Sequence, residues 1–364
     1  MSTTYSSLIT GTGSYIPERR IPNESFLDHD FYDARGETYD KNNEEIIQKF
    51  KEITGIEERR YVTDDLMTSD IAAIAAERAL ESAGVDKESL DYILVAHNFG
   101  DVRSDNRQTD MLPSLATRVK YKLKIENEKT IPYDLPFGCP GWLEGIKQAH
   151  YYLQSGDAKR ALVIGAETLS RIIDPHDRDS MIYSDGAGAT LLERRETDHK
   201  TGILSHATRN DTLNQAYLLR MEGSFHPDKN GKQLYLKMNG RKLYEYALSH
   251  VPSVVRDSID QAGLEIDDIS KILIHQANEK MDEAIVKRVF RLYGRREIPD
   301  KIMPMTISWL GNSSVATIPT LLDLLLNNKL EEHSPDDLEH LVFASVGAGM
   351  NINSMVYQMP SFKQ

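Results

Sequence analysis

The sequence has only one cysteine, Cys139, among 364 residues, so the chain cannot form an intrachain disulfide. A single thiol fits a protein of a reducing compartment and leaves open a catalytic nucleophile. There is no stretch of about 18 apolar residues, and the first residues lack a basic segment followed by an apolar core. We therefore expect a cytoplasmic protein that is neither secreted nor embedded in a membrane.

Basic residues are fewer than acidic ones: 43 Lys and Arg stand against 56 Asp and Glu, a formal net charge of −13. A surface of this charge repels nucleic acid and anionic membranes, so we expect neither as a partner. An acidic protein partner would need a local basic patch. With 40% apolar and 27% charged residues, the composition is that of a folded globular protein, which excludes wholly disordered, collagen-like and coiled-coil chains.

Three segments resemble segments about 180 residues further on, which indicates an internal duplication. The paired segments are 83–98 with 262–275, 160–165 with 340–345, and 138–139 with 311–312. The first two pairs contain apolar runs typical of buried strands, and the third pair opens two helical patterns. We predict an α/β fold of two similar halves, residues 1–195 and 196–364, that pack into one body. The polar stretch 193–200 is predicted to cross between them on the surface.

Cys139 lies where an extended run changes to apolar residues at helical spacing, beginning at Trp142 and Leu143. This pattern predicts a strand, a sharp turn and a helix, with Pro140 at the first helical position. A helix N-terminus would lower the pKa of the thiol and favour a nucleophile. The alternative is a small, buried, unreactive cysteine.

Two polar residues are candidate partners of this thiol. His275 follows the apolar run Lys271–Ile274, and side chains at the carboxyl ends of such strands commonly form ligand sites. Asn312 opens the counterpart of the cysteine helix in the second half. If a pseudo-twofold axis relates the halves, the two helix N-termini face the same point and bring Cys139 and Asn312 together. The alternatives are a hydrogen-bonded core histidine and a simple helix cap.

Two glycine-rich segments follow apolar runs. Gly347-Ala348-Gly349 could direct backbone amides at a ligand, as in an oxyanion hole, or could simply reverse the chain. Residues 184–189 read as a tight turn entering a strand rather than a phosphate loop, because no Lys-Ser or Lys-Thr follows them.

The segment from residue 279 to 301 is more basic than the rest of the chain. Helical spacing places Lys280, Lys287 and Arg291 on one arc, and the predicted apolar stripe consists of Met281, Ile285, Val289 and Leu292. A solvated helix face and a docking patch explain this pattern equally well.

Over nearly its whole length the sequence resembles β-ketoacyl-(acyl carrier protein) synthase III, a family with the thiolase fold. The motifs that carry the resemblance are residues 9–17, Thr54–Arg60, the Cys139 segment, Asp174–Arg178 with Ser184–Gly188, His275-Gln-Ala-Asn278 and Gly311-Asn-Ser-Ser314. The combination of Cys, His and Asn separates this branch from elongating synthases, which use Cys, His and His. The resemblance implies a five-layered α-β-α-β-α fold of two similar halves and a homodimer.

The resemblance also implies a role for each candidate residue. Cys139 would accept an acyl group from a thioester, and His275 and Asn312 would hold the malonyl thioester carbonyl while CO2 leaves, because two donors at the enolate oxygen stabilise its charge. The backbone amides of Cys139, Gly347 and Ala348 would form the oxyanion hole of the condensation step. The pantetheine arm of the substrate would contact Gly240, Arg241, Tyr244, Ala277 and Asn278. The substrates would be CoA or phosphopantetheine-linked thioesters, with no separate cofactor and no metal.

Lys280, Lys287 and Arg288 occupy positions at which the family meets the acidic acyl carrier protein, so the basic helix becomes a candidate docking surface for that partner. The sequence departs from the family where CoA adenine is held, because Lys49 and Ile53 replace a stacking Trp and an Arg. Priming by acetyl-CoA is therefore less expected than a carrier-bound or unusual acyl donor. The charged 100–107 loop also differs from the short apolar loop of the family.

Three hypotheses follow. The leading one is a condensing acyltransferase that uses Cys139, His275 and Asn312. The first alternative is a specialised relative that condenses a β-ketoacyl thioester with a second acyl unit and cyclises it, as in dialkylresorcinol formation. The other is a catalytically silent partner that only docks the carrier protein, which is disfavoured because all three reactive positions are filled.

Overall fold

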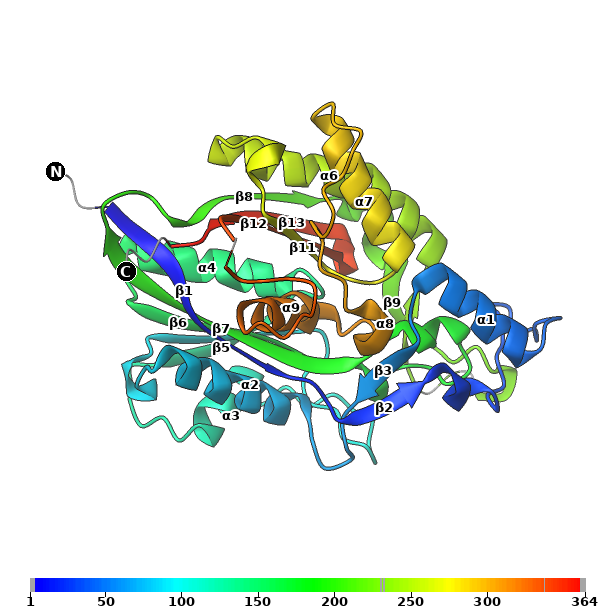
Figure 1. Cartoon of the computed structure of the whole chain (residues 1–364). Helices are drawn as coiled ribbons and strands as arrows, with labels where there is room; N and C mark the ends of the chain where they lie inside the picture. The colour runs from blue at the N-terminus through cyan, green and yellow to red at the C-terminus, as the bar shows by residue number, and fades with distance from the viewer. Residues whose placement is uncertain (1–3, 230, 232, 337, 361–364) are drawn as a thin grey trace.

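The computed structural model describes residues 4–229, 231, 233–336 and 338–360, and two β-sheets form its framework (Figure 1). The strands are β1 (Thr4–Tyr15), β2 (Arg19–Pro22), β3 (Glu58–Tyr61), β4 (Tyr92–His97), β5 (Ile131–Pro136), β6 (Arg160–Thr168), β7 (Asp185–Thr197), β8 (Gly202–Asn210), β9 (Leu219–Glu222), β10 (Tyr235–Met238), β11 (Lys271–Ile274), β12 (His340–Gly347) and β13 (Asn351–Gln358). The α-helices are α1 (Asn43–Thr54), α2 (Thr68–Ala83), α3 (Leu115–Lys122), α4 (Gly141–Ser155), α5 (Thr212–Gln215), α6 (Gly240–Ala262), α7 (Glu279–Leu292), α8 (Ile307–Leu310) and α9 (Thr317–Leu326). Within the described ranges, no helix has both the length and the apolar character that a membrane span requires.

The two large sheets repeat one topology. The first sheet has the order β1-β7-β6-β4-β5, and the second has the order β11-β12-β13-β8. In the first, β4 and β6 are parallel while β7 and β1 join antiparallel; in the second, β11 and β12 are parallel while β13 and β8 join antiparallel. Apart from β5, the order and the direction of the strands are the same in the two sheets, as expected after a duplication. The division at residue 195 stays a prediction, since the chain leaves β7 at Thr197 and enters β8 at Gly202.

The predicted surface crossing of residues 193–200 is wrong at its beginning. Residues 193–197 still belong to β7. Glu193 is buried, and the hydrogen bonds that it accepts from the Arg160 and Arg195 guanidinium groups compensate for its lost solvation. Only residues 198–201 connect the two sheets. A charged residue was taken for a surface residue because its cationic partner on β6 cannot be read from local sequence.

Helices complete five layers. Helices α2 and α3 lie against the outer face of the first sheet, α4 and α9 lie between the sheets, and α6 and α7 cover the outer side of the second sheet (Figure 1). All residues of α9 except its last, Leu326, are buried, as expected for a helix with sheets or helices on every side. The predicted α-β-α-β-α layering is thus present.

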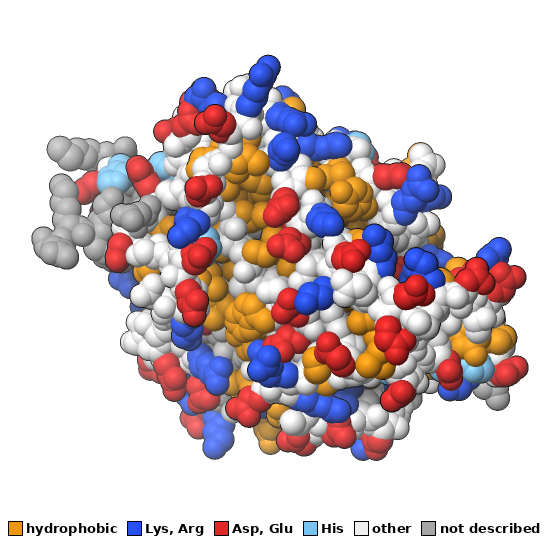
Figure 2. Space-filling model, turned by 45° about the vertical axis from the view of Figure 1, so that its right-hand side comes forward, with side chains coloured by type: hydrophobic (Ala, Val, Ile, Leu, Met, Phe, Trp, Pro, Cys, Tyr) orange, Lys and Arg blue, Asp and Glu red, His pale blue; other side chains and the backbone are white. Residues whose placement is uncertain are grey.

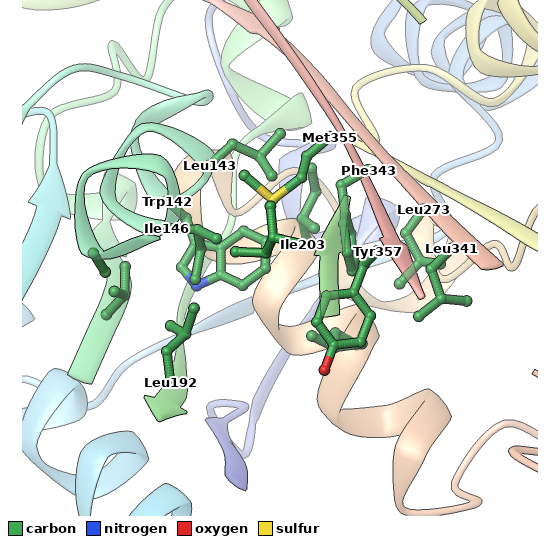
Figure 3. Close-up of a cluster of buried hydrophobic side chains, with 14 of the residues drawn as sticks. Trp142, Leu143, Ile146, Leu192, Ile203, Leu273, Leu341, Phe343, Met355 and Tyr357 are labelled. Atoms are coloured by element: carbon green, nitrogen blue, oxygen red, sulfur yellow. The ribbon is translucent and has the colours of Figure 1, made fainter. Parts of the chain in front are cut away.

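A hydrophobic cluster between the sheets joins the two halves (Figure 3). Trp142, Leu143 and Ile146 of α4 enter it from one side, and Phe343 and Tyr357 of the second sheet enter it from the other. The Trp142 and Phe343 rings meet edge to face with centroids 5.7 Å apart. This cluster anchors the helix that follows Cys139.

The tight turn predicted at residues 184–189 is wrong, because Asp185–Ala189 already form the start of β7. Gly188 serves close packing instead of chain reversal. A Cβ atom at Gly188 would lie 2.7 Å from Pro319 at the start of α9. Glycine therefore allows the central helix to approach the strand.

Candidate active site

Cys139 lies in the turn between β5 and α4, as the sequence predicts. The helix begins at Gly141, one residue later than expected, and Pro140 is its N-cap. Burial raises the pKa of the Cys139 thiol to about 11, the hydrogen bond from the Ser314 hydroxyl lowers it, and the Glu167 carboxylate raises it. The expectation of a lowered thiol pKa is therefore wrong, because loss of solvation outweighs the hydrogen bonds that lower the pKa.

His275 follows β11 and is buried, with its backbone N–H donating to the Ala344 carbonyl at 2.8 Å. Burial lowers the pKa of its imidazole to about 4, while a hydrogen bond with the backbone of Ser314 acts in the opposite direction. The ring is consequently neutral at physiological pH. Among the described residues, its Nδ1 atom has no hydrogen-bond partner. A neutral imidazole carries one N–H, and the hydrogen bond to the Ser314 backbone uses the nitrogen other than Nδ1, so Nδ1 is left as an acceptor.

Asn312 does not open a helix directly, contrary to the expectation. A 3-10 turn at Ser314–Ala316 intervenes, and α9 begins only at Thr317. Ser314 has φ +53°, a left-handed conformation that cannot continue a helix. The Asn312 Oδ1 atom accepts a hydrogen bond from the Ser314 backbone N–H at 2.8 Å. The donors of the amide, on Nδ2, therefore remain for a ligand.

The three predicted residues meet in one cavity of about 210 Å³, which Cys139, His275 and Asn312 all line. Most of the wall is apolar. The apolar lining residues are Phe99, Leu169, Leu219, Met221, Leu236, Met238, Leu243, Met281 and Val346. A thiol, an imidazole and a carboxamide thus face an apolar space, an arrangement that suits a thioester with a hydrocarbon chain.

Gly347 and Ala348 line the same cavity at the end of β12. The turn approaches Cys139 closely, because a Cβ atom at Gly347 would lie 2.9 Å from the Cys139 Cβ and from its backbone nitrogen. The structure places the predicted oxyanion residues together, and their role stays a prediction.

A second, larger cavity of about 1130 Å³ adjoins the first, and the two share Arg220, Met238, Leu243, Ala277 and Met281. All five residues predicted to contact the pantetheine arm line it: Gly240, Arg241, Tyr244, Ala277 and Asn278. The side chain of Asn278 also caps α7 by accepting a hydrogen bond from the Met281 N–H. The two cavities together form a path from the surface to Cys139.

Lys280, Lys287 and Arg288 are exposed on α7, which begins at the edge of the larger cavity. Figure 2 shows Lys and Arg side chains along the upper edge of the molecule, over the region of α6 and α7 in Figure 1. The predicted apolar stripe is correct for Met281, Ile285 and Val289 but wrong for Leu292, which is 43% exposed. Leu292 ends the helix, where no neighbouring element covers it.

Three polar residues near the thiol were not predicted as site residues from the sequence: Asn98, Glu167 and Ser314. Asn98 follows β4 and Glu167 lies near the end of β6, so both lie at the carboxyl ends of parallel strands. That position was a usable signal. No set of three or more His, Cys, Asp or Glu side chains suited to a metal ion occurs in the described part of the chain.

Comparison with known proteins identifies the family of the chain. Family models for 3-oxoacyl-(acyl-carrier-protein) synthase III and for its C-terminal region match residues 133–212 and 259–359. The chain is 32% identical over 346 residues to a β-ketoacyl-(acyl-carrier-protein) synthase III of Ehrlichia canis, covering 94% of this chain and 96% of that protein. The Xanthomonas axonopodis pv. citri enzyme of the same name is 34% identical over 327 residues, or 89% and 90% of the two chains. A synthase III structure from Thermus thermophilus aligns with TM-score 0.78 and 28% identity over 97% of this chain and 99% of that one, which confirms the thiolase-like fold.

Proposed function

Since the chain belongs to the 3-oxoacyl-(acyl-carrier-protein) synthase III family, we propose that this β-ketoacyl synthase uses Cys139, His275 and Asn312 for acyl transfer and decarboxylative condensation. The observation that carries the proposal is that these three side chains, from distant parts of the sequence, line one apolar cavity. The reaction joins two acyl units by a carbon–carbon bond, as in fatty acid biosynthesis.

In the first step, the Cys139 sulfur attacks the carbonyl carbon of an acyl thioester. A carbon–sulfur bond forms to Cys139, the bond to the pantetheine sulfur breaks, and the thiol proton passes to the departing thiolate. The backbone amides of Cys139 and Ala348 are the proposed donors to the tetrahedral oxyanion, and Gly347 gives the turn the close approach that this requires. The apolar cavity wall receives the hydrocarbon chain.

In the second step, a malonyl thioester loses CO2 and leaves an enolate. Asn312 donates a hydrogen bond from Nδ2 to its oxygen, and His275 turns to it the single ring N–H that faces the Ser314 backbone before substrate binds. Negative charge develops on this oxygen only during the reaction. The lowered pKa of His275 suits this role because a neutral imidazole donates a hydrogen bond without giving up a proton at once. The enolate carbon then attacks acyl-Cys139, releasing the β-ketoacyl thioester and a Cys139 thiolate that regains a proton from solvent.

The larger cavity supports a carrier-protein thioester as the acyl donor in preference to a CoA thioester. Lys49 and Ile53 both line its outer part, where they supply neither an aromatic ring nor a guanidinium for an adenine. Tyr39 also lines this cavity, but the Arg178 guanidinium lies 4.4 Å above its ring. The exposed Lys280, Lys287 and Arg288 would attract the acidic acyl carrier protein to the entrance.

A homodimer is part of the same proposal. Strand β5 lies at the edge of the first sheet, and Ile131 at its start is 48% exposed. Tyr121 on the adjoining helix α3 is 83% exposed. A free strand edge with apolar side chains beside it is suited to pairing with a second copy. Sedimentation analysis tests this: we expect a dimer that an Ile131→Arg substitution weakens, and a monomeric wild-type protein would contradict it.

Mass spectrometry of the intact protein tests the proposed chemistry. The protein is incubated with a panel of acyl-carrier-protein and acyl-CoA thioesters, and the mass increase is mapped to a residue. We expect an acyl adduct on Cys139 that is absent in Cys139→Ala, with carrier-protein donors reacting faster than CoA donors of the same chain length. After addition of malonyl-acyl carrier protein, the adduct should disappear as a β-ketoacyl product forms. No adduct with any donor, or an adduct that persists in Cys139→Ala, would contradict the mechanism.

A further inference from the structure

Ser314 contacts all three members of the proposed catalytic set. Its Oγ atom lies 3.2 Å from the Cys139 Sγ, its backbone N–H donates to Asn312 Oδ1, and its backbone lies within hydrogen-bonding reach of His275. It holds this place in a left-handed backbone conformation, φ +53°, which is unfavourable for a residue with a Cβ atom. Such strain is retained where the surroundings fix the residue, and it concentrates at functional sites.

Two further residues, the partly exposed Asn98 and the buried Glu167, continue this arrangement behind Ser314. The Asn98 Nδ2 atom donates to the Ser314 Oγ at 3.0 Å. The same Nδ2 atom also donates to Glu167 Oε1, which accepts a second hydrogen bond from the Asn98 backbone N–H at 2.6 Å. Glu167 is 2% exposed, so its carboxyl group depends on these protein donors.

The chemistry of the groups determines the direction of each hydrogen bond. Glu167 Oε1 already accepts from the Asn98 backbone N–H, so this oxygen is an acceptor whether or not the other carboxyl oxygen holds a proton, and the Asn98 NH2 group must face it. The other hydrogen of that NH2 group then points to the Ser314 oxygen. Because Ser314 Oγ already accepts this hydrogen, its own hydrogen is free to point to the Cys139 sulfur, a weak acceptor as a thiol and a strong one as a thiolate.

We propose that Glu167 and Asn98 are positioning residues that orient the Ser314 hydroxyl as a hydrogen-bond donor to the Cys139 sulfur, stabilising the thiolate that attacks the acyl donor. The inference rests on the proposed function only in taking Cys139 as the nucleophile. It adds a specific source of thiolate stabilisation in a cavity whose burial opposes ionisation. Without such a donor, the buried sulfur would ionise even less readily.

The other titratable groups around the sulfur do not supply this stabilisation. His275 in the same cavity is neutral, because burial lowers its pKa to about 4. Burial raises the pKa of the Tyr183 phenol well above its usual range. The charge of Glu167 itself opposes thiolate formation at Cys139. Glu167 therefore assists only through the orientation of Asn98, and the Ser314 hydroxyl is the donor.

The rate of Cys139 alkylation by iodoacetamide, measured between about pH 6 and 10, reads the thiolate directly and needs no acyl substrate. We expect Ser314→Ala to lower the rate at about pH 7 roughly tenfold, since a hydrogen bond to a charged group contributes an effect of that size. Asn98→Ala should lower the rate by an intermediate factor, because the Ser314 hydroxyl is then free to turn away.

Two further variants distinguish the effect of losing the Ser314 hydroxyl from an effect on folding. Ser314→Gly removes the same hydroxyl but relieves the left-handed backbone, so we expect a folded protein with the same loss of reactivity as Ser314→Ala. Ser313→Ala is the matched control, because the neighbouring Ser313 hydroxyl contacts Thr317 and not the sulfur.

Alkylation of Ser314→Ala or Ser314→Gly at the wild-type rate would overturn the proposal. If Asn98→Ala were alkylated at the wild-type rate, the proposed positioning role of Asn98 and Glu167 would be contradicted. Because this readout involves no acyl transfer, it can fail while Cys139 still forms an acyl adduct, and it can succeed when no adduct forms. The two proposals are thus tested separately.

Discussion

Gly347 and Cys139 are packed so closely that a Cβ atom on residue 347 would lie 2.9 Å from the Cys139 backbone nitrogen. Side chains essentially never approach a backbone atom so closely, so a substitution here must displace one of the two turns. Gly347→Ala should therefore lower kcat for condensation about tenfold or more, because the proposed oxyanion donors move with the turn. Steady-state kinetics with a carrier-bound donor measures the effect.

The matched control for this prediction is Gly186→Ala on β7. A Cβ atom at Gly186 would lie at ordinary contact distances, 3.5 Å from the Ser313 side chain and 3.7 Å from the Tyr15 backbone oxygen. This variant should stay within about threefold of wild type, the range expected of a neutral contact. Equal kinetics for Gly347→Ala and wild type would show that the turn is not part of the reacting site.

Substitution of His275 or Asn312 by Ala should separate the two half-reactions. Each variant removes a donor to the enolate oxygen, so decarboxylation of the malonyl thioester should slow by a factor of about 10² to 10³. Formation of acyl-Cys139 should continue, because neither side chain is required for the first transfer. Release of CO2 and intact mass measure the two steps. If the variants lost acylation and kept decarboxylation, the proposed role of these residues in the second step would be contradicted.

The neutral His275 predicts how stability depends on pH. Its pKa is about 4 in the folded protein, against an ordinary value of 6.5, so between these values the unfolded chain binds more protons. The contribution of His275 to stability is therefore complete above about pH 6.5 and is lost as the pH falls towards 4. Urea unfolding of His275→Gln should show a smaller fall in unfolding free energy between pH 7 and pH 5 than wild type. Equal falls in the two proteins would contradict the buried, neutral state.

Glu167 predicts a stability change of the opposite sign. Burial raises the pKa of its carboxyl to about 7, against an ordinary value of 4.5, so the folded chain holds an extra proton between these values. Its stabilising contribution is present below about pH 4.5 and is lost as the pH rises through 7. The difference in unfolding free energy between Glu167→Gln and wild type should therefore shift in favour of the variant from pH 5 to pH 7. A constant difference would show that Glu167 ionises normally.

Lys237 beside the larger cavity is a stability test that does not involve the reacting atoms. Its ammonium is 1% exposed and bridges the carboxylates of Asp174 at 2.6 Å and Asp177 at 3.0 Å. Lys237→Met leaves these carboxylates buried without their cation, which should lower the free energy of unfolding by about 3–5 kcal/mol. Lys49→Met, at an exposed position on the same cavity, should change it by less than about 1 kcal/mol. Similar effects for both variants in urea unfolding would contradict the buried ion pair.

The strands and helices that carry the reactive groups could largely be predicted from local sequence. Cys139 lies between an extended run and an apolar helix, and His275 ends an apolar strand, because these patterns reflect which faces are buried. The helix after Asn312 was predicted too early, since the strained backbone of Ser314 depends on contacts with Cys139 and Asn312 that no local pattern records. Residues 184–189 were predicted to form a turn because glycine occurs both where the chain reverses and where elements pack closely, and the sequence does not distinguish the two cases.

By itself, the sequence determined the α/β class, the duplicated topology and the identity of the thiol, imidazole and carboxamide. Only the tertiary structure decided the chemistry around them: the raised pKa of Cys139, the neutral His275 and the chain from Glu167 through Asn98 to Ser314. The physical reason is that periodicity reports which side of an element is buried, whereas ionisation and hydrogen bonding depend on groups that meet from distant parts of the chain within a few ångströms.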